Sequence, residues 1–540
     1  MLSYRKLAMR VLGRPLHTEG IDSPRPASQR AAAFILTAAM LTTLAAPAFA
    51  DIWHIENGDI TISAGESGNN VTQNNNTTYG DTNTIITNQN KDTASSHTVT
   101  IEAKDKDDKV EVTLKDVNID TSSRNKAAVS VTGEGDTNIK LDGDNALKSD
   151  IYRSGIYGSG SLTISGGEND SLTAQGGSGA NGISSSGSLT ISGGTVTANG
   201  DDGGRGISSS GSVTISGGST VTANGGSGTI SGGDGIWSGG GVTISGGSTV
   251  TANGGNGGSL VGGDGIRSGG GLTVSDGTVT AKGGNGDSKD GYGGDGIRSG
   301  GVVTISGNTV NAAGGYGGKV GGYGICSFDR VAISGGTVEA AGGNGSTGGG
   351  SGIYSSVIDL SGSLELTAKA GSPTGKALLQ NGRELDLDTI KDKLGPGAKV
   401  TTTDANGKTK EVSSPLPVEP EGPVIPEESS SSSDDGSATP SAPASPLPGL
   451  TVTDKDGQRI SYTSTQSGNT LTVCVGRFTA SFRISLAALR QLRAEGIETI
   501  TFQTVLCSTT LSVDELLAMG GEDAEAVLTH RFTDSSLTVG

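Results

Sequence analysis

The chain has little of the material from which a globular core is usually built. Its 540 residues include only two tryptophans, seven phenylalanines and nine tyrosines, and hydrophobic residues make up 32% of the total. The same chain contains 93 glycines. One large packed core is therefore excluded, because too few large side chains can be buried. Disorder would be the ordinary interpretation of such a composition, unless the glycines are periodic.

Residue types that carry catalysis or bind metals are also scarce. There are three cysteines and four histidines, and no Ser–His–Asp arrangement or zinc-ligand spacing appears. Lysine and arginine number 38 against 56 acidic residues, a net charge of −18. A polyanion of this size is a poor partner for nucleic acid or an anionic membrane surface.

Long apolar runs are confined to the first 50 residues. A basic leader there precedes "AAAFILTAAMLTTLAAPAFA", which ends in the small-x-small pattern of signal-peptidase cleavage. We expect residues 1–50 to be a signal peptide and the mature protein to be extracellular or on the cell surface. The mature chain would carry 32 basic and 54 acidic side chains, a net charge of −22. It would keep no apolar run long enough to span a membrane.

The glycines are periodic. Gly-Ile pairs recur at intervals of 24 to 31 residues, each followed by a "TISGG"-like segment, a "TVTA"-like segment and a glycine-rich stretch. Self-similarity of this period is typical of a solenoid. The isoleucines are Ile156, Ile183, Ile207, Ile236, Ile266, Ile297, Ile325 and Ile353.

Within a unit the apolar residues alternate as in a β-strand. In "VTISGGSTVTA" the period of two sends Val242, Ile244, Val250 and Ala252 to one side of the chain. Glycines at the corners accept positive φ without steric cost. The pattern predicts a mainly β fold: a right-handed parallel β-helix with three short strands and about five small buried side chains per turn.

The chain divides into six expected segments. After the signal peptide, we expect an N-terminal strand or cap at 51–97, β-helix repeats at 98–370 and a C-terminal cap of the solenoid at 371–411. A Pro/Ser-rich linker at 412–449 leads to a small α+β domain at 450–540. In that domain Cys474 and Cys507 both lie in strand-like runs, so they form either a disulfide or two buried thiols.

The repeats resemble those of a known family. The unit "GISSSGSLTISGGTVTA", together with the entry segment "VTLKDVNID…AAVSV…TNIKLDGDNALKSD", is similar to the carbohydrate-binding β-helix proteins secreted by anaerobic Gram-positive bacteria. The resemblance covers about residues 51–370. It implies a pectate-lyase-like fold, binding of acidic or cellulosic plant polysaccharides, and bound calcium.

The residue after each Gly-Ile pair points outward because the isoleucine points inward. Neighbouring turns lie about 4.8 Å apart, so we expect Trp237, Arg267 and Arg298 to form an exposed ribbon that binds carbohydrate. Tryptophan stacks on sugar rings and guanidinium pairs with uronate carboxylates. The alternative is a Trp–Arg stack that only covers a corner. The full column is Tyr157, Ser184, Ser208, Trp237, Arg267, Arg298, Cys326 and Tyr354.

Asp234, Asp264 and Asp295 form a second column, three residues before the first. Like charges one turn apart repel unless they are compensated. Either a calcium ion binds there, with carbonyl oxygens from flexible glycine loops, or each aspartate pairs with Arg267 or Arg298, or it caps a solvated turn.

These observations predict a secreted or cell-surface protein that binds polysaccharide, either of the plant cell wall or a host glycan, without cleaving it. One alternative is a structural or adhesive stalk, with the C-terminal domain as a candidate for docking to the cell envelope. A less favoured alternative is a polysaccharide lyase that uses the pairs Asp264–Arg267 and Asp295–Arg298.

Overall fold

The computed structural model describes residues 51–414 and 449–539, with gaps at 455–457, 461, 468, 476, 478, 505–507, 520–523 and 531–534. The predicted signal peptide and residues 415–448 of the predicted linker lie outside the described residues. The chain separates into two units at residues 420 and 421. No helix in the described ranges has the length and apolar character that a membrane span requires.

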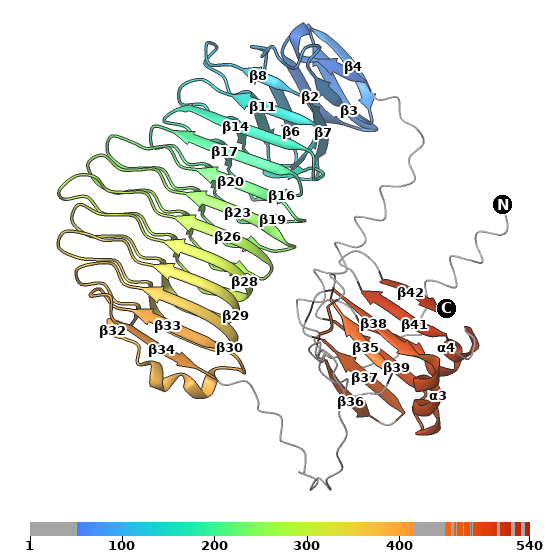
Figure 1. The fold of residues 1–540 in the computed structure, drawn as a ribbon. Coiled ribbons are helices and arrows are strands. Elements are labelled where there is room, and N and C mark those ends of the chain that lie inside the picture. Colours follow the sequence, from blue (N-terminus) through green and yellow to red (C-terminus); the bar gives the residue numbers. More distant parts are fainter. Residues whose placement is uncertain are drawn as a thin grey trace, which may run out of the picture. The chain divides into compact units, whose positions relative to one another are not determined.

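The first unit is a parallel β-helix, which confirms the predicted fold (Figure 1). Each full turn contributes three short strands, because a glycine corner follows each apolar pair. In one turn these are β21 (Ile236–Ser238), β22 (Val242–Ile244) and β23 (Ser248–Asn253). Each strand pairs in parallel with its counterparts in the turns before and after.

Three parallel stacks of strands result. The first contains β2 (Ile60–Gly65), β6 (Val99–Ala103), β9 (Val129–Gly133), β12 (Ile156–Gly158), β15 (Ile183–Ser185), β18 (Ile207–Ser209), β21, β24 (Ile266–Ser268), β27 (Ile297–Ser299) and the start of β29 (Ile325–Ala341) and β30 (Ile353–Lys369), then β31 (Leu378–Gln380). The second contains β1 (Ile52–His54), β5 (Ile85–Thr87), β7 (Lys109–Lys115), β10 (Asp136–Asp142), β13 (Ser161–Ser165), β16 (Leu189–Ser192), β19 (Val213–Ser216), β22, β25 (Leu272–Val274), the start of β28 (Val303–Ala313) and the middle of β29 and β30. The third contains β8 (Asn118–Asp120), β11 (Asp144–Lys148), β14 (Ser171–Ser178), β17 (Thr195–Asp201), β20 (Thr220–Asn224), β23, β26 (Gly277–Lys282) and the ends of β28, β29 and β30, then β33 (Lys399–Thr403).

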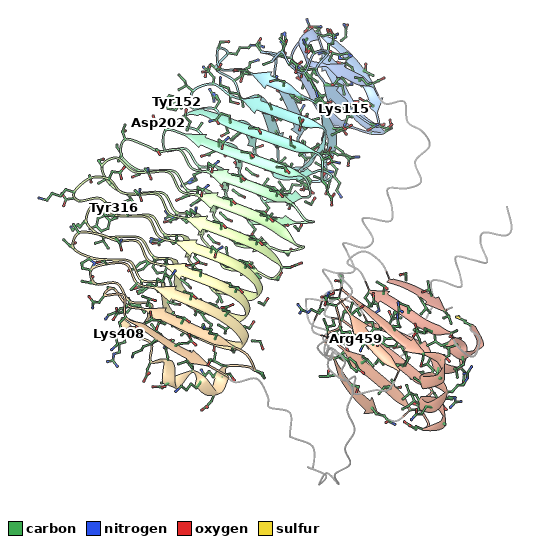
Figure 2. All side chains as sticks on the ribbon, viewed as in Figure 1. Lys115, Tyr152, Asp202, Tyr316, Lys408 and Arg459 are labelled. Atoms are coloured by element: carbon green, nitrogen blue, oxygen red, sulfur yellow. The ribbon has the colours of Figure 1, made fainter. Side chains whose placement is uncertain are left out.

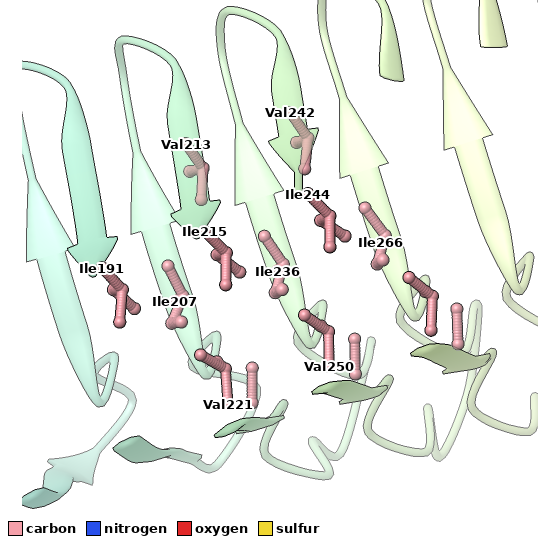
Figure 3. Packing of buried hydrophobic residues seen from close by; sticks show 14 of the residues in the cluster. Ile191, Ile207, Val213, Ile215, Val221, Ile236, Val242, Ile244, Val250 and Ile266 are labelled. Carbon is pink, nitrogen blue, oxygen red and sulfur yellow. The ribbon is translucent and has the colours of Figure 1, made fainter. Parts of the chain in front are cut away.

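The core is a set of columns of small side chains. Ile236, Val242, Ile244, Val250 and Ala252 of one turn are all at most 1% exposed, so the predicted inward set is confirmed. Figure 3 shows these columns continuing from one turn to the next. The hydrophobic core is continuous from Ile55 to Val412. Stability therefore comes from contacts between turns more than from any single turn.

Antiparallel hairpins flank the solenoid. Near its start, β3 (Gly68–Gln73) pairs with β2 and with β4 (Asn76–Asp81). At its end, β32 (Arg383–Glu384) pairs with β31, and β34 (Thr409–Ser413) pairs with β33. The 3-10 helices η1 (Ile55–Asn57), η2 (Leu387–Thr389) and η3 (Lys391–Lys393) lie in these end regions.

The second unit is a small α+β domain with its own core. The helix α3 (Leu486–Ala494) begins after Ser485, whose hydroxyl caps it by accepting from the amide of Ala488. The strands are β35 (Leu450–Thr453), β38 (Ala480–Ser485), β41 (Glu525–His530) and β42 (Ser535–Val539) in one sheet, and β36 (Thr463–Ser467), β37 (Thr470–Cys474), β39 (Thr499–Gln503) and β40 (Ser508–Ser512) in the other; α4 spans Val513–Met519. Cys474 is a free thiol that contacts Gln503, and Cys507 lies outside the described residues.

Candidate functional site

The site lies beside the first stack, between the outward residues of its strands and the glycine-rich loops. The parallel register places Trp237 beside Arg267, and Arg267 beside Arg298, as the Gly-Ile spacing predicts. The column continues through Cys326 to Tyr354. The expectation of an exposed ribbon is confirmed for Arg267, which is exposed, and is wrong in part for Trp237 and Arg298, which are only partly exposed. Arg205 covers the ring of Trp237, and Arg298 packs on the ring of Phe328.

The loops themselves are ordered by hydrogen bonds between glycines. We call residues 225–235, 254–265, 283–296, 314–324 and 342–352 the glycine flange. Figure 1 shows these loops stacked beside the solenoid in the green to orange turns. Backbone hydrogen bonds of 2.7–3.0 Å connect one loop to the next through the flange and one glycine on either side of it. In the following series the amide of each glycine donates to the carbonyl of the glycine named before it: Gly204, Gly226, Gly233, Gly255, Gly263, Gly284, Gly294, Gly315, Gly322, Gly343, Gly350 and Gly371.

Close backbone approach explains why these loops contain so much glycine. A Cβ atom on Gly263 would lie 1.9 Å from the carbonyl oxygen of Gly233, and a Cβ on Gly233 would lie 1.9 Å from that of Gly204. No other residue fits there without moving the backbone. The expectation of flexible loops with free carbonyl oxygens is therefore wrong for Gly233, Gly263 and Gly294, whose oxygens accept amides of the next turn.

The aspartate column forms a ladder of side-chain to backbone hydrogen bonds. The Oδ1 atom of Asp234 accepts from the amide of Asp264 at 2.9 Å, and Asp264 accepts from Asp295 at 2.7 Å. Asp295 in turn accepts from the amide of Tyr323 at 2.7 Å. All three aspartates are 4–6% exposed, so the interpretation as solvated turn caps is wrong.

Arginines compensate two of the three carboxylates. The Nε atom of Arg205 lies 3.3 Å from Oδ2 of Asp234, and Nη1 of Arg298 lies 3.3 Å from Oδ2 of Asp295. The predicted pairing is thus confirmed for Asp295, while Asp234 pairs with Arg205 and with neither of the predicted arginines. Arg267 makes no ion pair with any described residue, so the expected Asp264–Arg267 pair is not formed.

Burial changes the protonation of this ladder. It raises the pKa of Asp264 to about 8, with the charges of Asp295 and Asp234 acting in the same direction. Burial also raises the pKa of Asp295, to about 6, because the hydrogen bond from Tyr323 and the charge of Arg298 offset only part of the effect. At neutral pH Asp264 is therefore mostly uncharged.

Trp237 is stacked under an arginine of the preceding turn. The guanidinium carbon of Arg205 lies 4.4 Å from the centroid of its ring, and a guanidinium at this distance is attracted to the ring face. One face of Trp237 is therefore not free to stack on a sugar. Arg205 occupies the aspartate position of its own turn, "GGRGI" against "GGDGI", so alignment of the units was the signal that could have identified it.

A polar groove of about 570 Å³ runs along this site. We call it the arginine groove. Its chemistry comes from the side chains of Asn181, Arg205, Asp234, Asp264, Arg267 and Arg298, and its other wall is glycine-flange backbone. Trp237 supports the groove through Arg205 and does not itself line it.

The carboxylates as they lie do not fit a calcium ion. Their Oδ1 atoms hold backbone amides, and arginines hold the Oδ2 atoms of Asp234 and Asp295. Calcium prefers six to eight oxygen ligands. No group of three or more His, Cys, Asp or Glu side chains in the described part of the chain is arranged to hold a metal. Calcium binding by this column stays a prediction from the sequence, and the side-chain arrangement opposes it.

No protein-family model, curated protein or solved structure matches the chain.

Proposed function

We propose that this chain is a secreted or cell-surface protein that binds an acidic polysaccharide in the arginine groove without cleaving it. The observation that carries the proposal is the alignment of Arg205, Arg267 and Arg298 along one groove. Guanidinium groups bind carboxylates in bidentate geometry. Arg267, which is exposed and has no ion-pair partner among the described residues, is the strongest contact for a uronate group.

Charge balance favours an acidic ligand over a neutral one. Three arginines but only two carboxyl groups, those of Asp234 and Asp264, line the groove. Burial raises the pKa of Asp264, which favours its uncharged form. The groove therefore has a net positive charge although the whole chain carries −18. A positively charged groove in an acidic protein attracts anionic ligands, while the negative charge of the remaining surface repels them.

Binding without cleavage is proposed because the groove offers no suitable general base. Among the described residues that line it there is no histidine, lysine or tyrosine. Arginine stays protonated at physiological pH. Of the two aspartates that line the groove, Asp234 is buried and paired with a guanidinium group. Asp264 is also buried, and its Oδ1 atom accepts from the Asp295 amide. Both arrangements oppose proton abstraction from a substrate.

The test compares an acidic polymer with the same polymer after its carboxylates have been converted to neutral methyl esters. We expect the full chain to bind polygalacturonate and to bind its fully methyl-esterified form at least about tenfold more weakly, with affinity falling as salt rises. Arg267→Ala should lose most of this binding. Arg383→Ala, which removes an exposed arginine of β32 outside the groove, is the matched control. If the folded wild-type chain binds neither polymer, the stalk alternative replaces this proposal.

A further inference from the structure

A second groove of about 750 Å³ lies beside earlier turns of the first stack. Its floor carries outward hydroxyl side chains, among them Thr100, Ser130 and Thr132, and its wall is formed by loop residues of the same turns. Gly179 and Asn181 line both this groove and the arginine groove. The two grooves therefore follow one another along a single face of the solenoid.

Two non-glycine residues that line the second groove have positive φ: Asn125, of a residue type that tolerates this conformation, and Tyr152, which does not. Tyr152 has φ +60° at the third position of a turn closed by the bond from the Arg153 amide to the Asp150 carbonyl. The same position in the next two turns is Gly179, with φ +76°, and Gly203, with φ +82°. Glycine adopts this conformation freely, whereas a bulky side chain is strained in it.

Packing in the core does not account for this tyrosine. Its side chain projects from the loop edge of the solenoid, and the residue is 78% exposed (Figure 2). A Cβ atom on Gly179 would lie 2.9 Å from a ring carbon of Tyr152, so the ring rests against bare backbone at the junction of the two grooves. Exposed residues kept in strained conformations are concentrated at binding sites.

The neighbouring side chains supply the rest of a sugar-binding surface. Tyr157 stands on the floor of the groove and is 43% exposed. The side chain of Arg153 makes one hydrogen bond, from Nε to Oδ1 of Asn125 at 3.4 Å, and no ion pair with a described residue. Two aromatic rings beside an available guanidinium and a floor of hydroxyls suit a sugar ring that carries an acidic group.

We infer that Tyr152, Arg153 and Tyr157 form a second subsite, which binds a uronate unit of the polymer that occupies the arginine groove. This inference rests on the proposed function. The strands β12 and β27, which carry Tyr157 and Arg298, are five turns apart, or about 24 Å at the usual strand spacing. One polymer chain lying along the solenoid axis engages both sites, so its affinity exceeds that of a short oligomer through effective concentration.

The test compares polygalacturonate with a short galacturonate oligomer, using the full chain and isothermal titration. Tyr152→Gly should weaken polymer binding by about tenfold or more, because one of two linked sites is removed, and should not lower the melting temperature. Arg153→Gln should weaken polymer binding in the same direction. Tyr79→Ser is the matched control, since Tyr79 is 77% exposed in β4 and lines neither groove.

The outcomes separate the two proposals. If the wild type binds the polymer, Arg267→Ala abolishes binding and Tyr152→Gly retains wild-type affinity, the second subsite is overturned and the arginine groove stands. If the folded wild type binds no acidic polymer, both are overturned. Loss of polymer affinity in Tyr152→Gly, with oligomer binding to the arginine groove unchanged, supports the second subsite.

Discussion

The guanidinium group of Arg205 lies against two partners of the next turn at once: its carbon is 4.4 Å from the centroid of the Trp237 ring, and its Nε is 3.3 Å from Oδ2 of Asp234. The ring fixes the plane of the guanidinium and the carboxylate fixes its rotation. Arg205 therefore faces the groove with little side-chain entropy left to lose on binding. Arg298 is anchored similarly, by Asp295 and by the ring of Phe328 at 5.3 Å.

Removal of the Arg205 side chain should lower both the stability of the fold and the affinity for polygalacturonate, and a second substitution should restore only the stability. We expect Arg205→Ala to lower the free energy of unfolding by about 1–3 kcal/mol, because it leaves the buried Asp234 carboxylate without its ion-pair partner, and to weaken polygalacturonate binding. The double variant Arg205→Ala/Asp234→Asn should recover much of the stability but not the binding. Urea denaturation and titration calorimetry measure the two effects. Unchanged affinity in Arg205→Ala would remove this arginine from the site.

Much of this architecture could be predicted because it depends on local pattern. The alternation of Val242, Ile244, Val250 and Ala252 fixes which side chains face inward. The constant position of Trp237, Arg267 and Arg298 after each Gly-Ile pair fixes the register between turns. Both follow from a period that repeats along the chain, so no tertiary information is needed.

The errors concern interactions between loops. The order of the glycine flange comes from bonds such as that from the Gly284 amide to the Gly263 carbonyl, which form only when two loops of different length stack in register. The ion-pair partner of Asp234 could not be predicted, because it depends on the rotamer of Arg205, which lies 29 residues away in the sequence. The strained backbone of Tyr152 has no sequence signal except the glycines that replace it in later turns.

The close packing of the glycine flange predicts how much a single added methyl group destabilises the fold. Gly263→Ala should lower the free energy of unfolding by about 3 kcal/mol, because the added Cβ would lie 1.9 Å from the Gly233 oxygen and the stacked loops must separate. In the control Gly158→Ala the nearest atom to the new Cβ is the Ser184 oxygen at 3.7 Å, an ordinary contact. That change should stay within about 1 kcal/mol. Equal effects in urea denaturation would show that the flange is not packed as described.

Calcium provides a direct test of the carboxylate ladder. We expect neither millimolar calcium nor a chelator to change the melting temperature by more than about 1 °C. The Oδ1 atoms of all three aspartates and the carbonyls of Gly233 and Gly263 already accept hydrogen bonds. Arginines hold the Oδ2 atoms of Asp234 and Asp295. Occupation of a site at a hundred times its dissociation constant would stabilise the fold by about 2.7 kcal/mol. A calcium-dependent rise that disappears in Asp264→Asn would place the ion in this column after all.

The buried Asp264 should make the fold less stable as pH rises, which is the opposite of the usual effect of an aspartate. Its pKa is raised from 3.8 to about 8 by burial and by the neighbouring carboxylates. Between about pH 4 and pH 8 the folded chain therefore holds a proton that the unfolded chain releases, so the free energy of unfolding falls as pH rises through this window and levels off above it. Asp295, with a pKa raised to about 6, adds to the fall between pH 4 and pH 6.

Asp264→Asn isolates this contribution, because the amide oxygen can still accept from the Asp295 amide but carries no charge. We expect the variant to match the wild type at pH 4 and to exceed it by at least about 1 kcal/mol at pH 8.5, since each pKa unit corresponds to about 1.4 kcal/mol. Asp287→Asn, at an exposed loop position, should leave the slope unchanged. Polygalacturonate affinity should also fall above pH 8 in the wild type alone, as the ionised Asp264 cancels one positive charge of the groove. Parallel pH profiles for wild type and Asp264→Asn would show that this carboxyl is ionised in the folded chain throughout.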